Sequence, residues 1–178
     1  MQAESRETLR QFFAGLSEQT FQVQLGVADP PLIDYIADLL VRFVRSDAVY
    51  RIRSLTGQPL AQVAVMMSEA EKRVGDAKRD VHRHIGDFTL FWAGVYPETL
   101  RRMQSASKQD HLVDYCQQGK RSYWIASTIS TDKDRDNGEV LSRLSREFEL
   151  CAYGLREVRR EWERRDDGGD SSPPLLLN

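Results

Sequence analysis

The feature that most constrains the fold is a long apolar stripe in the middle of the chain. Apolar side chains recur there every three or four positions: Val63, Met67, Ala70, Val74, Ala77, Val81, Ile85, Phe88, Trp92 and Val95. At about 100° per residue they fall on one face of an α-helix. A strand cannot present them together, because its side chains alternate between two faces. The stripe predicts one long half-buried helix, or two helices in phase.

A second stripe lies near the end of the chain, with alternating spacings of three and four residues: Leu141, Leu144, Phe148, Cys151, Leu155, Val158 and Trp162. This heptad pattern is short, so it favours the core edge of an antiparallel bundle over an extended coiled coil. Asp29 before Pro30 and Pro31 predicts another helix start, because Asp caps a helix and proline suits its first turn.

Weaker signals mark the other helices. A first helix is expected from Ser5 with an apolar side to Leu16, and the pattern restarts at Ser17 and carries Phe21, Val23 and Leu25. A short segment follows from Ser46 to Leu55. Gly119 is typical of a helix C-terminus, so the chain after it is expected to start a new helix.

These patterns predict an all-α fold, an irregular bundle with one long central helix and a long C-terminal helix. The central helix is expected to pack on residues 29–45 and 139–165. Residues 1–165 are expected to form a single domain, which is an ordinary size for one hydrophobic core. Residues 166–178 consist mainly of Asp, Gly, Ser, Pro and Leu, a composition that predicts a flexible tail.

Composition limits the classes of function. The chain has 178 residues, of which 40% are hydrophobic and 29% charged, and its net charge is −2. A nucleic-acid or anionic-membrane binder usually carries a clear basic excess, so neither partner is expected. Cys116 and Cys151 stand among apolar neighbours and are expected to be buried and reduced. There is no apolar run near the ~18 residues of a membrane span and no secretory signal pattern, so we expect a cytoplasmic protein.

One candidate site combines acidic and imidazole side chains. Asp80, His84 and Asp87 are spaced by four and three residues, which places them on one helix face. Such a group suits a general base or a divalent metal, the one cofactor that the sequence suggests. His111 and Asp114 repeat the spacing on another helix, so the two helices could build a four-ligand site.

The same face also has a plainer interpretation. Glu69, Arg73 and Asp76 continue it towards the N-terminus, which is typical of a solvated or interhelical salt-bridge surface. The sequence favours this interpretation over the metal site. The Glu-x-x-His pairs of ferritin-like di-iron bundles do not occur in the chain.

An aromatic segment is the place where the sequence predicts a pocket. It contains two glycines among large side chains: Gly86, Phe88, Phe91, Trp92, Gly94 and Tyr96. A glycine inside a helix costs about 1 kcal/mol relative to alanine. We therefore expect Gly86 and Gly94 to allow the close approach of another helix or of a ligand.

The end of the tail is a candidate partner-binding peptide, with the residues Pro173, Pro174, Leu175, Leu176 and Leu177. Short apolar peptides dock into grooves, and prolines lower the cost of ordering them. Taken together, the residues predict a protein-interaction or regulatory module with a protein partner or a homo-oligomeric state. A metal-binding bundle or metal-dependent enzyme is the alternative, and the sequence does not decide whether the chain is an enzyme.

Overall fold

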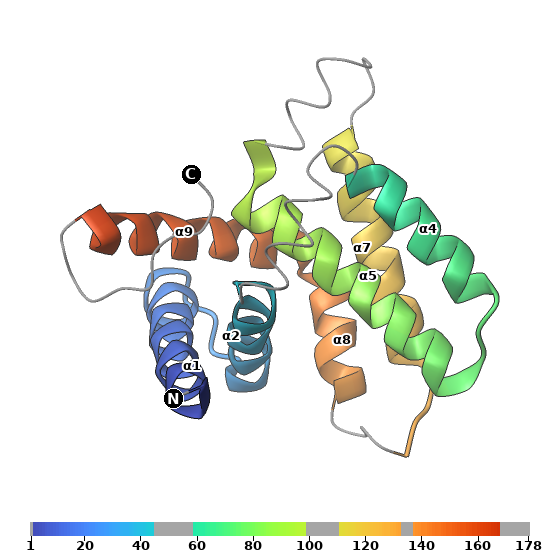
Figure 1. Ribbon diagram of the computed structural model, residues 1–178, viewed down its shortest axis with the longest axis horizontal. Helices are drawn as coiled ribbons and strands as arrows, with labels where there is room; N and C mark the ends of the chain where they lie inside the picture. The colour runs from blue at the N-terminus through green and yellow to red at the C-terminus, as the bar shows by residue number, and fades with distance from the viewer. Residues whose placement is uncertain (1, 45–58, 99–110, 133–136, 168–178) are drawn as a thin grey trace. The chain divides into compact units, whose positions relative to one another are not determined.

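The computed structural model describes residues 2–44, 59–98, 111–132 and 137–167, without the side chains of 2–6, 59–62, 111–114 and 166–167. Within these ranges the chain forms helices and no strands (Figure 1), which confirms the all-α class. The chain separates into two compact units. The terminal unit contains residues 1–54 and 153–178, and the central unit contains residues 55–152. The single domain expected for residues 1–165 stays a prediction.

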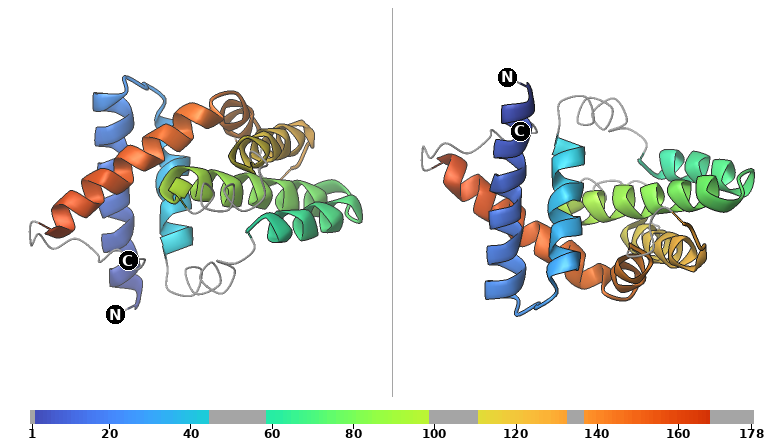
Figure 2. Two further views of the ribbon diagram at one scale, coloured as in Figure 1. Left: turned by 90° about the horizontal axis from the view of Figure 1, so that it is seen from above. Right: turned by 90° about the horizontal axis from the view of Figure 1, so that it is seen from below.

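The terminal unit is built on a helical hairpin. Helix α1 (Gln2–Glu18) and helix α2 (Pro30–Val44) pack side by side, and the part of α9 (Phe148–Asp167) beyond residue 152 crosses them (Figure 2). Trp162 is 1% exposed and meets the rings of Phe12 and Phe13 edge-on, at centroid distances of 6.4 and 5.1 Å. This aromatic cluster links the first helix of the chain to the last one.

Helix α2 begins where the sequence predicts. Asp29 Oδ1 accepts a hydrogen bond from the backbone N–H of Leu32 at 3.2 Å, and Pro30 is the first helical residue. Its inner face is apolar and buried, with the side chains of Ile33, Ile36, Leu40, Phe43 and Val44.

The connection between α1 and α2 differs from the predicted restart of the helical pattern at Ser17. The helical backbone continues without a restart from α1 into a π-helix, η1 (Gln19–Gln24), in which the N–H of Leu25 reaches the carbonyl of Thr20 at 3.0 Å. The wider i→i+5 turn changes which side chains share a face. Phe21 is buried as predicted, but Val23 is 76% exposed, so its assignment to the apolar side is wrong.

The central unit contains α4 (Pro59–Glu71), α5 (Gly75–Val95), α7 (His111–Thr128), α8 (Asn137–Arg146) and the first turn of α9. Helix α5 packs against α4 and α7, and α7 packs against α8 (Figure 2). The aromatic end of α5 is in the core, where Phe91 and Trp92 are each 1% exposed.

The apolar stripe of residues 63–95 is divided between two helices rather than one. Helix α4 ends at Glu71, and α5 begins at Gly75. Gly75 has a φ of +56°, a left-handed conformation that glycine adopts at little cost. Val74 lies in this turn and is 83% exposed, so its assignment to the buried face is wrong.

Two further boundaries differ from those that the sequence pattern suggests. Helix α7 runs through Gly119 to Thr128, so the prediction that a helix ends at Gly119 is wrong. A Cβ at Gly119 would lie 2.5 Å from Phe148 Cε2 and closer still to Thr89 Oγ1. The second apolar stripe is divided at Glu147 between α8 and α9, yet each of its side chains from Leu141 to Trp162 is buried.

Several predictions concern residues outside the described ranges. They include the short segment from Ser46 to Leu55. The tail beyond Asp167 is also outside them. Among the helices that the structure describes, none combines the length and hydropathy required to cross a bilayer.

Candidate functional site

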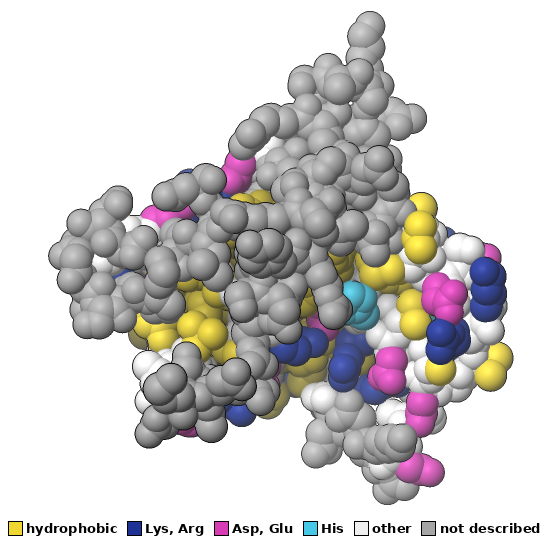
Figure 3. Space-filling model, in the orientation of Figure 1, with side chains coloured by type: hydrophobic (Ala, Val, Ile, Leu, Met, Phe, Trp, Pro, Cys, Tyr) yellow, Lys and Arg dark blue, Asp and Glu magenta, His cyan; other side chains and the backbone are white. Residues whose placement is uncertain are grey.

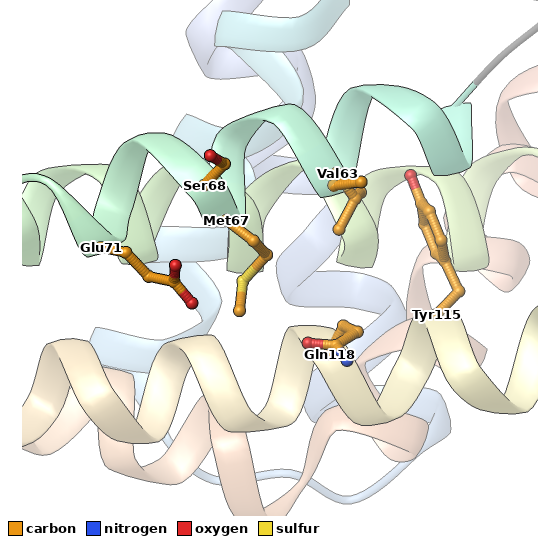
Figure 4. A pocket seen from close by; sticks show the side chains of 7 residues that line it. Val63, Met67, Ser68, Glu71, Tyr115 and Gln118 are labelled. Atoms are coloured by element: carbon orange, nitrogen blue, oxygen red, sulfur yellow. The ribbon is translucent and has the colours of Figure 1, made fainter.

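A pocket of about 440 Å³ lies between α4 and α7 in the central unit (Figure 4). It is lined by Val63, Ala64, Met67, Ser68, Glu71, Tyr115 and Gln118. Its volume is within the range of roughly 300–1,000 Å³ that is usual for small-molecule sites. Apolar walls with a few polar groups are also typical of such sites.

Helical spacing places the lining side chains of each helix on one face, and the faces of α4 and α7 lie opposite each other. Val63, Met67 and Glu71 are four residues apart on α4, and Tyr115 and Gln118 are three apart on α7, so each set shares a face. Figure 4 shows Met67 and Glu71 extending from α4 towards α7, and Tyr115 extending from α7 towards α4. The pocket is therefore the space that these two faces leave between them.

Tyr115 is the unusual residue among those that line the pocket. It is 1% exposed, and among the described residues its hydroxyl has no hydrogen-bond partner. Burial raises the pKa of Tyr115 well above its ordinary value of 10.0, and the neighbouring Cys116 adds to this shift. The hydroxyl therefore stays protonated at neutral pH. Buried tyrosine hydroxyls usually have a partner.

Gln118 supplies a second unpartnered group one turn further along α7. Its Oε1 atom is buried and has no hydrogen-bond partner in the part of the chain that the structure describes. One turn beyond it, the hydroxyl of Ser122 contacts Met67 Sδ at 3.9 Å, so α7 touches α4 directly there. Both polar atoms, the Tyr115 hydroxyl and Gln118 Oε1, are closed off from solvent, so they lie behind the surface of the pocket and not on it.

The exposed polar side chains that line the pocket belong to α4. They are Ser68 and Glu71. The adjacent Glu69 has a lowered pKa, because Arg73 donates a hydrogen bond to it at 2.6 Å and adds its positive charge. The described face over α4 and α5 carries both charge signs, interspersed with apolar side chains (Figure 3).

The predicted metal residues have different surroundings. Asp87 is completely buried, and the hydroxyl of Tyr123 donates a hydrogen bond to its Oδ1 at 2.8 Å. Asp80 and His84 are exposed on the same helix. In the part of the chain that the structure describes, no three His, Cys, Asp or Glu side chains form a group that could hold a metal ion.

The second half of the predicted four-ligand site is His111 with Asp114. Both belong to the first turn of α7, whose side chains lie outside the described residues. Whether two helices share a metal site therefore stays a prediction. The candidate tail peptide, from Pro173 to Leu177, also lies outside the described residues.

The aromatic segment expected to form a pocket lies in the core of the central unit. Its residues Gly86, Phe88, Phe91, Trp92, Gly94 and Tyr96 are all buried. A Cβ at Gly86 would lie 2.5 Å from Tyr123 Cδ1, so this glycine allows the close helix packing that the sequence predicts. The pocket described above is lined by different residues.

Sequence reasoning missed Tyr115 and Gln118. A signal was present, because Tyr115, Gln118 and Ser122 are spaced by three and four residues on one helix face. The predicted helix end at Gly119 concealed it, since that boundary assigns Ser122 to another helix.

The chain matches no protein-family model, no curated protein and no solved structure. Function is therefore inferred from the pocket and its chemistry.

Proposed function

We propose that this chain is a cytoplasmic protein-interaction or regulatory module that binds a ligand between α4 and α7 and a protein partner elsewhere. The observation that carries the proposal is the pocket of about 440 Å³ between α4 and α7, which combines apolar walls with a few polar groups.

The apolar wall supports the same interpretation. Val63, Ala64 and Met67 offer aliphatic and thioether surface next to a few polar atoms. Apolar surface supplies affinity in such a pocket, and the polar atoms orient the ligand. A regulatory module has to bind and orient its ligand, and it needs no reactive group for this.

The test fills the pocket from α4. N-phenyl-1-naphthylamine, an uncharged fluorescent probe, should bind the native protein at one saturable site. Ala64→Trp places a large side chain in the pocket and should weaken this binding at least tenfold. Val65→Trp is the matched control, because Val65 is the next residue, is 64% exposed and does not line the pocket. No saturable binding, or equal binding by both variants, would contradict the proposal.

Metal binding is the alternative function, and it rests on the sequence pattern of Asp80, His84, Asp87, His111 and Asp114. Elemental analysis of protein purified without chelators tests it. A stoichiometric divalent metal that is lost in His84→Ala supports the alternative. Metal-free protein, also after incubation with Zn²⁺ and Mn²⁺, counts against it.

A further inference from the structure

Glu71 is the one charged side chain among the described residues that line the α4–α7 pocket. The residue is exposed, and Figure 4 shows its side chain extending from the last turn of α4 towards α7. Within the described ranges no hydrogen bond or ion pair engages its carboxylate. The pocket therefore has a negative group at one end that a ligand can reach from solvent.

The charges around this end of the pocket leave the negative charge of Glu71 in place. Arg73 donates to Glu69 at 2.6 Å, and the pKa of Glu69 is lowered first by Arg73 and least by Lys72, so both cations act on that carboxylate. The last turn of α4 contains no basic residue. Asp76 lies in the first turn of α5, where it offsets the positive end of that helix. Because a helix C-terminus is itself partly negative, the end of α4 favours a positive group.

The wall that continues from Glu71 along α4 is apolar. Val63, Met67 and Glu71 occupy successive turns, and a rise of 1.5 Å per residue separates the first from the last by about 12 Å along the helix axis. Figure 4 shows Met67 between Glu71 and Val63. A thioether adapts to the shape of the apolar group that it contacts. A ligand that uses this whole wall has an apolar body with a positive group at one end.

We infer that the α4–α7 pocket binds a free organic amine, whose ammonium group pairs with Glu71 while its apolar body lies against Val63, Ala64 and Met67. The inference rests on the proposed function and names the chemical class of its ligand. The ammonium group keeps part of its hydration because Glu71 is exposed, so the large cost of burying a charge does not arise. The ligand is a small molecule, since the pocket has the volume of a small-molecule site.

The experiment compares three probes of one shape by NMR, using the methyl signals of Met67 and Ala64. The amine 1-naphthylmethylamine is a cation at neutral pH, 1-naphthylmethanol is uncharged, and 1-naphthoate is an anion. The amine should shift both signals saturably and bind about threefold to tenfold more tightly than the alcohol, because an exposed ion pair and a cation at a helix C-terminus each contribute a modest factor. The anion should bind most weakly, and about 0.5 M NaCl should reduce the preference for the amine, since salt screens exposed charges.

Two variants assign the preference to one carboxylate. Glu71→Gln retains the shape of the side chain and removes its charge, so the preference for the amine over the alcohol should fall to less than about twofold. Binding of the alcohol should be unchanged. Glu147→Gln is the control, because it makes the same change in net charge at an exposed residue of the central unit that does not line the pocket. It should retain the preference.

The outcomes distinguish this inference from the proposed function. Equal binding of the amine and the alcohol, or an equal loss of preference in both variants, would overturn the amine inference, and so would the absence of saturable shifts with all three probes. Tighter binding of the capped tripeptide Ala-Lys-Ala than of the amine would also overturn it, since the cation would then come from a protein side chain. The proposed function survives these results if Ala64→Trp, but not Val65→Trp, blocks N-phenyl-1-naphthylamine.

Discussion

At the scale of single residues, two buried tyrosines of α7 differ in one hydrogen bond. Within the described ranges the Tyr115 hydroxyl has no partner, whereas the Tyr123 hydroxyl donates to Asp87 at 2.8 Å. Tyr115→Phe should raise the free energy of unfolding by about 1 kcal/mol, because it removes an unpaired buried hydroxyl. Tyr123→Phe should lower it by about 1–3 kcal/mol, because the buried carboxylate loses a donor. Urea denaturation measures both. A loss of stability in Tyr115→Phe would show that its hydroxyl is paired in solution.

His82 gives the central unit a predicted response to pH. The side chain is 4% exposed, and its pKa is lowered from 6.5, first by burial and then by the charges of Lys78 and Arg121. The unfolded chain therefore takes up a proton near pH 6.5, while the folded chain takes it up only at lower pH. Stability contributed by neutral His82 is present above pH 6.5 and declines as the pH falls towards the folded pKa.

The measurement compares the native protein with His82→Gln, which does not titrate. Free energies of unfolding at pH 7.5 and 5.5 should differ less in the variant than in the native protein. An identical difference in both proteins would show that His82 takes up its proton equally in the folded and unfolded states.

At the scale of helices, close packing outweighs helix propensity at Gly119. Alanine favours a helix by about 1 kcal/mol relative to glycine, but a Cβ at this position would collide with the buried ring of Phe148. Gly119→Ala should therefore lower the free energy of unfolding by about 1–3 kcal/mol. Gly15→Ala is the control, because nothing lies within 4 Å of its added Cβ; it should be neutral or stabilise by up to about 1 kcal/mol. Thermal or urea denaturation compares the two variants.

At the scale of the whole chain, the terminal unit joins segments from both ends of the sequence. Trp162 is 1% exposed against Phe12 and Phe13, whereas Trp124 is 59% exposed. Trp162→Ala should lower the free energy of unfolding by about 3–5 kcal/mol, and Trp124→Ala should change it by less than about 0.5 kcal/mol. Similar losses in both would contradict the packing described for the terminal unit.

The tail prediction also concerns the whole chain. Deleting residues 167–178 should leave the melting temperature unchanged and abolish binding of a protein partner that co-purifies with the full chain. This follows if Pro173–Leu177 is a recognition peptide. A loss of stability above about 1 kcal/mol would instead show that the tail packs on the protein itself.

The sequence by itself determined the helical class, much of the buried surface and the start of α2. These features are local. Apolar spacing decides which face a helix buries, and an Asp before two prolines caps the first turn whatever surrounds it. The stripe from Leu141 to Trp162 was therefore predictable residue by residue, although the backbone divides it at Glu147.

The tertiary structure alone decided the position of the pocket and the roles of Gly75 and Gly119. A glycine suits either a left-handed helix end or a close contact between helices, and the spacing around it does not distinguish them. Position 119 accommodates only glycine because Phe148, distant in sequence, packs where a Cβ would be. Tyr115 likewise became a candidate site residue only through its position opposite α4, because an unpaired hydroxyl depends on which groups the fold brings next to it.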